Sequence, residues 1–311
     1  MVNSRLEKQE LLCDDGAGMA GSFLGLPPAY SAYNSSRIVI LPVPFDQTSS
    51  YKKGSDRGPA ALIEASRHLE LYDIETDAEI YKLGLHTAAP VEAQHSAQML
   101  EQTYARVTSY LREGKFVVSL GGEHSITLAS ASAHAEAFSP IGILQLDAHA
   151  DLREAYEGNR FSHACVMARI LELPQVQSVV AVGIRSMSRG EKKRQAGVRT
   201  FFAHEILGGE WYKQVVDALP ERVYMTIDLD VFDPALMPST GTPEPGGLTW
   251  QQIMKLIKEV CATRTLVGFD VVELCPSAET SPDFLAAKLV YRTLSCRFAE
   301  SMCLTLQATA R

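Results

Sequence analysis

Short apolar runs recur along the chain, and the stretches between them carry apolar residues at helical spacing. The runs that predict strands cover residues 37–41, 116–120, 141–147, 178–184, 199–202, 223–228 and 265–273. An unbroken apolar run of this length is typical of a strand that is buried on both faces of a sheet. Strands that alternate with helices predict an α/β fold whose mostly parallel sheet is covered by helices on both faces.

Helical periodicity is clearest between residues 93 and 113. The apolar residues there stand at i, i+4, i+7 and i+11, so they line one face of a helix that packs on the sheet. They are Leu100, Tyr104, Val107 and Leu111. The other predicted helices cover residues 59–71, 126–137 and 161–173 or begin after Thr249 and at Ser281. A Ser or Thr at the N-cap position marks the start of the last two.

The N-terminal segment differs from the rest of the chain. Residues 1–36 contain several glycines and prolines but no sustained hydrophobic period, which predicts an irregular arm that packs on a neighbouring subunit. No linker, repeat or shift in composition divides residues 37–311, so we predict a single catalytic domain there. Within it, residues 42–59 form a long loop rich in Ser, Gly and Lys, a length that often indicates a binding loop.

Composition narrows the class of protein. With 46% hydrophobic and 21% charged residues, the chain has the composition of an ordinary globular protein. Its formal net charge of −8 argues against binding to nucleic acid. No run of about 18 apolar residues predicts a membrane span. The six cysteines include no CxxC pair, which indicates reduced thiols, and no signal peptide is evident, so a cytoplasmic location is expected.

Candidate chemistry gathers at the ends of three predicted strands. Asp147, His149 and Asp151 follow the run 141–146 at a spacing of two, so their side chains would point the same way. The carboxyl ends of parallel strands are where open α/β sheets bind their ligands. These three residues offer two carboxylates and an imidazole, which are metal-ligating groups.

Two further strand ends supply the same kinds of side chain. His124 follows the run 116–120, and Asp228 and Asp230 end the run 223–228. The plainer interpretation is that these acids are solvated or cap the next helix. Because burying four carboxylates without positive charge is costly, six such residues at three strand ends favour a metal site.

These segments together resemble motifs of the ureohydrolase family, which comprises arginases and agmatinases. The matching segments, in family order, are 121–125 (GGEHS), 147–151 (DAHAD), 162–164 (SHA), 228–234 (DLDVFDP), 241–247 (GTPEPGG) and Glu273. The resemblance implies a three-layer α/β/α fold around a central, mainly parallel eight-stranded sheet, with two Mn²⁺ ions at its edge. It also implies a homo-oligomer, a trimer or a hexamer.

The resemblance also implies which residues bind the two metals. One would be held by His124, Asp147, Asp151 and Asp228, the other by Asp147, His149, Asp228 and Asp230, so that Asp147 and Asp228 bridge. Oxygen ligands with imidazole and no thiolate suit Mn²⁺, although Co²⁺, Ni²⁺ and Zn²⁺ would also be held. The two ions would generate hydroxide, which attacks a guanidinium and releases urea and an amine.

Two further residues receive roles from the resemblance. His163 matches the histidine that shuttles the proton to the leaving amine, and Glu273 matches the acid that pairs with the guanidinium. The alternatives are a helix-capping or core histidine at 163 and an ordinary salt bridge at 273. The expected substrate is a small guanidino compound.

The choice of guanidino compound depends on Arg153. Arginases usually carry Asn at this position, so Arg153 counts against arginase. The surrounding pattern resembles bacterial agmatinases, and hydrolysis of agmatine to putrescine and urea is the leading hypothesis. A cation at the pocket mouth would instead suit a guanidino acid such as guanidinobutyrate, unless Arg153 pairs with Glu154 or Glu157. A third hypothesis is an inactive, regulatory ureohydrolase-like subunit.

Overall fold

The structure, a computed structural model, describes residues 21–206 and 208–309, with side chains described up to residue 300. A single sheet of eight parallel strands runs through these residues in the order β2-β1-β3-β8-β7-β4-β5-β6. The strands are β1 Ile38–Val43, β2 Leu85–Thr87, β3 Phe116–Gly121, β4 Ile141–Leu146, β5 Val176–Ile184, β6 Val198–Phe202, β7 Arg222–Asp228 and β8 Thr265–Val272. The predicted α/β class is confirmed.

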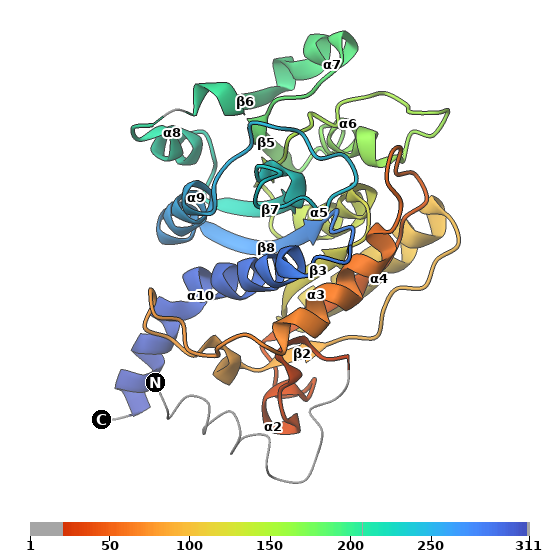
Figure 1. Cartoon of the computed structure of the whole chain (residues 1–311). Helices are drawn as coiled ribbons and strands as arrows, with labels where there is room; N and C mark the ends of the chain where they lie inside the picture. The colour runs from red at the N-terminus through yellow and green to blue at the C-terminus, as the bar shows by residue number, and fades with distance from the viewer. Residues whose placement is uncertain (1–20, 207, 310–311) are drawn as a thin grey trace.

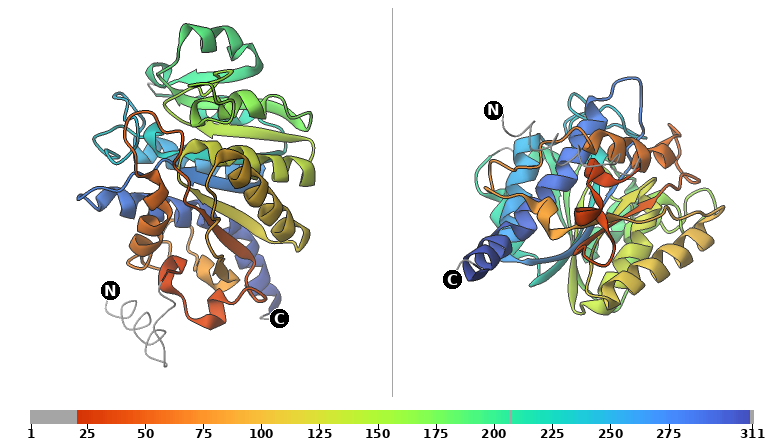
Figure 2. Two further views of the ribbon diagram at one scale, coloured as in Figure 1. Left: turned by 90° about the vertical axis from the view of Figure 1, so that its right-hand side faces the viewer. Right: turned by 90° about the horizontal axis from the view of Figure 1, so that it is seen from below.

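Helices cover both faces of the sheet (Figure 1). The α-helices are α2 Pro28–Ser31, α3 Gly58–Ser66, α4 Ser96–Arg112, α5 Thr127–Ala137, α6 Val166–Ile170, α7 Arg189–Arg194, α8 Trp211–Asp217, α9 Trp250–Thr263 and α10 Ser281–Thr309. One layer contains α3, α8, α9 and α10, and the other contains α4, α5 and α6. Figure 2 shows these layers from two further sides. The arrangement is the three-layer fold that the resemblance implied.

The period of two within each strand explains how both faces are buried. In β1, Ile38 and Ile40 join the core beneath α3, α9 and α10, whereas Val39 and Leu41 join the core beneath α4. Successive side chains of a strand point to opposite faces, so a strand between two helix layers needs apolar residues at every position. This is why the central strands read as mostly apolar runs, with single buried polar residues at Ser119, Gln145, Thr226 and Asp270.

Some short elements were not predicted. Strand β2 has three residues and lies at the edge of the sheet, where Ile38 pairs with Leu85. Its sequence is too short to show a period, and its pairing with β1 is what makes it a strand. The polar segment that becomes α7 and the segment that becomes α8 were also missed, and the predicted helix over 161–173 is shorter, with α6 at Val166–Ile170.

The predicted arm is partly described. Residues 21–36 contain the 3-10 helix η1 Phe23–Gly25 and the helix α2, and they are not uniformly irregular as expected. Phe23 and Leu24 are buried in the core of the same chain, and the backbone N–H of Leu24 donates to Ser66 Oγ on α3 at 2.7 Å. Residues 1–20 lie outside the described residues, and the arm remains a prediction there.

Within the described part of the chain, no helix has both the length and the apolar character that crossing a membrane requires.

A buried histidine in this core makes stability depend on pH. His134 on α5 is fully buried, its ring centroid lies 4.6 Å from that of Tyr224, and its Nδ1 bonds the backbone oxygen of Ser130 at 2.7 Å. Burial lowers the pKa of His134 to about 4, and the bond to Ser130 opposes this shift only in part. Between about pH 6.5 and pH 4 the unfolded chain therefore binds a proton that the folded chain does not, and stability falls as pH falls.

We expect His134→Leu to reduce this acid sensitivity. The wild-type protein should lose roughly 2 to 3 kcal/mol more of its free energy of unfolding between pH 7 and pH 4.5 than the variant does. Urea unfolding of metal-free protein at the two pH values measures this difference. His68→Gln, at an exposed histidine, is the control and should keep the wild-type acid sensitivity. Equal acid sensitivity in wild type and His134→Leu would contradict the prediction.

Candidate metal centre and active site

The sheet order brings the predicted metal ligands together. Strands β3, β8, β7 and β4 are consecutive neighbours in the sheet and all run parallel, so their carboxyl ends lie along one edge. His124 follows β3, Asp147 follows β4, Asp228 ends β7 and Glu273 follows β8. Four segments that are far apart in sequence thereby contribute to one site.

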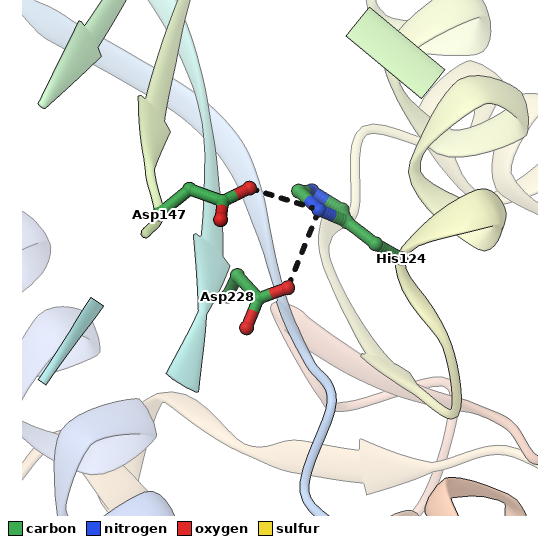
Figure 3. A group of neighbouring side chains, drawn as sticks. All are labelled: His124, Asp147 and Asp228. Atoms are coloured by element: carbon green, nitrogen blue, oxygen red, sulfur yellow. Dashed lines mark ion pairs between the residues drawn. The ribbon is translucent and has the colours of Figure 1, made fainter. Parts of the chain in front are cut away.

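Three predicted ligands form a first group around the ring of His124. One possible ligand atom from each of His124, Asp147 and Asp228 lies within 4.8 Å of the others. His124 Nδ1 is 3.2 Å from Asp147 Oδ2 and 3.4 Å from Asp228 Oδ2, and Figure 3 shows both carboxylates directed at the imidazole. Asp151 Oδ2 lies 3.0 Å from the same nitrogen. All four residues are buried.

A second group shares one member with the first. Asp147, His149 and Asp230 also offer ligand atoms within 4.8 Å of one another. His149 Nδ1 is 2.8 Å from Asp230 Oδ2 and 3.8 Å from Asp147 Oδ1. Because the two carboxylate oxygens of Asp147 face different groups, this residue is placed to contact two cations.

The ring of His124 is oriented from behind by a buried hydrogen-bond chain. His124 Nε2 lies 2.9 Å from Thr226 Oγ1, and this hydroxyl donates to Asp270 Oδ1 at 2.6 Å. Since the Thr226 proton goes to Asp270, the Nε2 proton of His124 goes to Thr226. In the neutral ring, His124 Nδ1 then carries the lone pair, has no hydrogen-bond partner and faces carboxylate oxygens. An unprotonated buried nitrogen among acids fits a metal cation and nothing apolar.

The charges of the cluster fit the same interpretation. Burial and then the charges of Asp230 and Asp151 raise the pKa of Asp147 to about 7. Burial and the charge of Asp230 raise the pKa of Asp228 well above its usual value. Burial alone would lower the pKa of His149, but the charge and hydrogen bond of Asp230, with the charges of Asp147 and Asp151, together outweigh it and raise the pKa to about 10. Protonated imidazoles therefore balance part of the negative charge when no cation is bound. Divalent cations such as Mn²⁺ would take over this role, because oxygen and imidazole donors without thiolate suit them.

The structure places the two predicted bridging residues differently. Asp147 belongs to both groups, whereas Asp228 belongs to the first. The second oxygen of Asp228, Oδ1, accepts the backbone N–H of Asp230 at 2.9 Å. The bridging role fits the position of Asp147, and for Asp228 it remains a prediction.

A cavity of about 290 Å³ opens above these groups. Four of the six predicted ligands line it, together with both predicted catalytic residues, His163 and Glu273. His124 and Asp147 are almost fully buried and do not line the cavity. Their ligand atoms lie within 4.8 Å of a ligand atom of Asp228, which does line it. A substrate in this cavity would therefore meet the candidate metal groups, a histidine and a carboxylate together.

Glu273 is held in a restricted backbone conformation. Its φ of 66° is left-handed, which is uncommon for a residue with a side chain and is often found at functional sites. The backbone N–H of Glu273 donates to the backbone oxygen of Gly122 at 2.8 Å, and its Oε1 accepts the backbone N–H of His124 at 2.7 Å. Burial, followed by the charge of Glu123, raises the pKa of Glu273 well above its usual value. A cation at Oε2 would stabilise the charged form.

Gly122 permits this arrangement because it has no side chain. A Cβ at position 122 would lie 1.9 Å from the backbone oxygen of Phe45, in the loop after β1. The close approach is fixed by the backbone N–H of Glu123, which donates to that same oxygen at 2.8 Å. The second glycine of the GGEHS segment therefore serves close packing of the loop 42–59 on the end of β3.

Arg153 does not pair with either residue that the sequence suggested. Its Nε lies 3.8 Å from Glu191 Oε2, and its guanidinium lies 5.0 Å from the ring centroid of Tyr156. Glu154 instead pairs with three other arginines, namely Arg160, Arg169 and Arg194. The sequence had left pairing with Glu154 or Glu157 open; the acid that meets Arg153 instead comes from α7, 38 positions further along the chain.

Several residues of the site were not assigned a role from the sequence. Glu123 is buried and accepts a hydrogen bond from Thr48, which contacts His163. Thr226 and Asp270 orient His124, and Glu191 lines the cavity. Glu191 had a readable signal, because Ser188 and Glu191 have the spacing of a capping box, which the structure contains. Thr226 and Asp270 had no recognisable sequence signal, because buried strands often include a single polar residue that has no role in a site.

Comparison with known proteins identifies the family of this chain. The arginase family matches residues 36–296. An N(1)-aminopropylagmatine ureohydrolase of Thermus thermophilus is 40% identical over 275 residues, which cover 85% of this chain and 92% of that protein. The agmatinase of Pyrococcus horikoshii is 35% identical, covering 81% and 89%. The crystal structure of the agmatine ureohydrolase of Thermoplasma volcanium has a TM-score of 0.83 at 29% identity, covering 94% and 99%. The chain therefore belongs to the arginase family, as its motifs indicated.

Proposed function

We propose that this arginase-family hydrolase uses two Mn²⁺ ions to cleave agmatine into putrescine and urea. The observation that carries the proposal is the pair of ligand groups that share Asp147, lying at a cavity that also contains His163 and Glu273. A cavity lined with acids and histidines suits hydrolysis, in which water is the other reactant.

The cations and the side chains of the cavity have separate roles in the proposed reaction. When bound, the two divalent cations supply hydroxide from water at neutral pH. Glu273 presents Oε2 to the planar guanidinium, whose charge compensates the buried carboxylate and whose fork geometry fits it. His163 lies on the cavity wall and carries the proton that the leaving amine needs, since imidazole changes charge near neutral pH.

The pairing of Arg153 bears on the substrate. Because Arg153 lies near Glu191, its positive charge is partly balanced, and the argument for an anionic guanidino acid loses force. Agmatine, with a cationic amine tail, remains the leading substrate. N(1)-aminopropylagmatine is a second candidate, because the relative at 40% identity is named for its hydrolysis. The expected homo-oligomer and cytoplasmic location remain predictions from the sequence.

Urea release from a panel of substrates tests the proposal. The panel contains agmatine, N(1)-aminopropylagmatine, guanidinobutyrate, guanidinopropionate and arginine, each with Mn²⁺-loaded protein. We expect agmatine to have the highest kcat/KM. A higher kcat/KM for N(1)-aminopropylagmatine or guanidinobutyrate would change the proposed substrate but leave the proposed reaction, hydrolysis to urea, unchanged. Release of urea from none of them would contradict the proposed activity and favour an inactive regulatory subunit.

The charge of Arg153 should tune preference among these substrates. In Arg153→Gln, Glu191 loses a neighbouring cation, so the cavity becomes more favourable for an amine tail and less so for a carboxylate tail. Since the pair is partly exposed, we expect the ratio of kcat/KM for agmatine over guanidinobutyrate to rise roughly two- to fivefold. A fall in this ratio would show that Arg153 does not repel the amine.

A further inference from the structure

A buried carboxylate next to the metal ligands has no role in the proposed reaction. Glu123 is fully buried and accepts hydrogen bonds from four donors. They are the backbone N–H of Thr48, the backbone N–H of Ser49 at 3.2 Å, the hydroxyl of Thr48 at 2.6 Å and the hydroxyl of Ser125 at 2.6 Å. Two of these four donors belong to Thr48, in the loop 42–59.

Thr48 also contacts the candidate proton shuttle, His163. Its Oγ1 lies 3.1 Å from His163 Nδ1 and accepts the backbone N–H of His163 at 3.0 Å. The three residues come from segments that are distant in sequence, and one threonine hydroxyl joins them. The loop after β1 thereby connects the end of β3 to the segment that carries His163.

The positions of the hydrogens follow from counting donors. Glu123 meets four donors, so its carboxylate acts as acceptor and carries no proton of its own. The hydroxyl proton of Thr48 therefore goes to Glu123 Oε1. With that proton committed, Thr48 Oγ1 can only accept from His163. Ser162 Oγ also lies 3.2 Å from His163 Nδ1 and can either donate or accept there. Since a lone pair on Nδ1 would face the lone pair of Thr48 Oγ1, a ring proton on Nδ1 is the arrangement that suits both contacts. The lone pair is then on Nε2.

We propose that Thr48 and Glu123 are positioning residues that fix the tautomer and orientation of the His163 ring. The inference rests on the proposed role of His163 as proton shuttle and goes beyond it by naming what makes the shuttle work. With Nδ1–H bonded to Thr48, Nε2 takes up a proton and later gives it to the departing amine.

A purely structural role for Thr48 predicts something different. The same contacts would also anchor the loop 42–59, whose Ser49, Ser50 and Tyr51 line the cavity. Loss of an anchor would loosen that wall and weaken substrate binding, so KM would rise. Loss of ring positioning would slow proton transfer after binding, so kcat would fall while KM changed little.

Three variants separate these roles. Thr48→Val keeps the shape of the side chain and removes the hydroxyl, whereas Thr48→Ser keeps the hydroxyl and removes the methyl group. We expect Thr48→Val to lower kcat roughly 10- to 100-fold, the usual effect of removing a group that orients a functional imidazole, with KM within about threefold of wild type. Thr48→Ser should retain kcat within about threefold. Thr263→Val, on the exposed side of α9, is the control for a threonine-to-valine change.

The outcomes that overturn the proposal are distinct. Unchanged kcat in Thr48→Val, or equal losses in Thr48→Val and Thr48→Ser with a rise in KM, would assign the hydroxyl to loop structure. Metal content is measured in each variant and should remain two ions per chain. A loss of metal in Thr48→Val would assign the effect to the neighbouring ligand His124 and would also overturn the proposal.

A measurement on the wild-type protein tests the relay without relying on turnover. Long-range ¹H–¹⁵N correlation spectra report which ring nitrogen of a histidine carries the proton, and His163→Gln identifies the His163 signals. With diamagnetic Zn²⁺ in place of Mn²⁺, we expect His163 in the Nδ1–H form. The Nε2–H form would overturn the relay. If the wild-type protein released no urea from any substrate, the proposed function would fail, while this spectrum would still decide the tautomer.

Discussion

Replacing Asp147 with asparagine should remove metal binding and urea release together. Asp147 belongs to both ligand groups, and each of its oxygens already has a donor behind it. Oδ1 accepts the backbone N–H of His149 at 2.6 Å, and Oδ2 accepts Gln145 Nε2 at 2.8 Å. An asparagine NH₂ would face one of these donors or a cation, and each arrangement is repulsive.

The size of the effect follows from the loss of both ions. Metal-assisted hydrolysis depends on several kcal/mol of charge stabilisation, so we expect turnover to fall roughly 10³-fold or more. The fold should survive, because burial and the charges of Asp230 and Asp151 disfavour the ionised Asp147 when no cation is present. Metal content by mass spectrometry and thermal unfolding of the metal-free protein measure these two expectations.

A nearby aspartate provides the matched control. Asp233 lies five positions after Asp228 and accepts the backbone N–H groups of Ala235, Gly246 and Gly247. These bonds, the first of them most strongly, lower the pKa of Asp233, which marks it as a support of the loop rather than a member of either ligand group. Asp233→Asn should keep two ions per chain. Two ions bound at wild-type affinity in Asp147→Asn would contradict the shared role of Asp147.

The sequence predicted the parts of this protein that depend on local periodicity. Central strands such as β4 and β7 are buried on both faces, so each left a mostly apolar run that ends at ligands. Strand β2 and the short helix α7 left no such signal. β2 exists because β1 offers it a partner, and the hydrogen bonds that make it a strand are absent from its own three residues.

The same division applies to the site. His124, Asp147 and Asp230 follow strands directly, and parallel pairing then forces their side chains to one edge of the sheet. Residues that act on these ligands from elsewhere could not be assigned, because their function is a contact across the fold. Thr48 and His163 are 115 positions apart, and Arg153 meets Glu191 across 38 positions. Spacing in the sequence carries no information on such contacts.

A second large effect is expected at Glu273. Glu273→Gln keeps the volume of the side chain, and its amide oxygen can still accept the His124 N–H that Oε1 accepts now. The amide NH₂ would then replace Oε2, the oxygen that we assign to the guanidinium. A donor would face a donor in the bound state, and the positive charge of the substrate would lose its partner.

The loss of that partner should appear mainly in substrate binding and in the energy of the transition state, with both metals retained. Removing one member of a buried charge pair costs roughly 2 to 5 kcal/mol, so we expect kcat/KM for agmatine to fall about 10²- to 10³-fold. Glu273→Asp keeps the charge but shortens the side chain by one methylene. We expect it to lose less of kcat/KM than Glu273→Gln does. Burial raises the pKa of Glu273, so the neutral glutamine should fold at least as stably as wild type. An unchanged kcat/KM in Glu273→Gln would mean that the guanidinium binds elsewhere in the cavity.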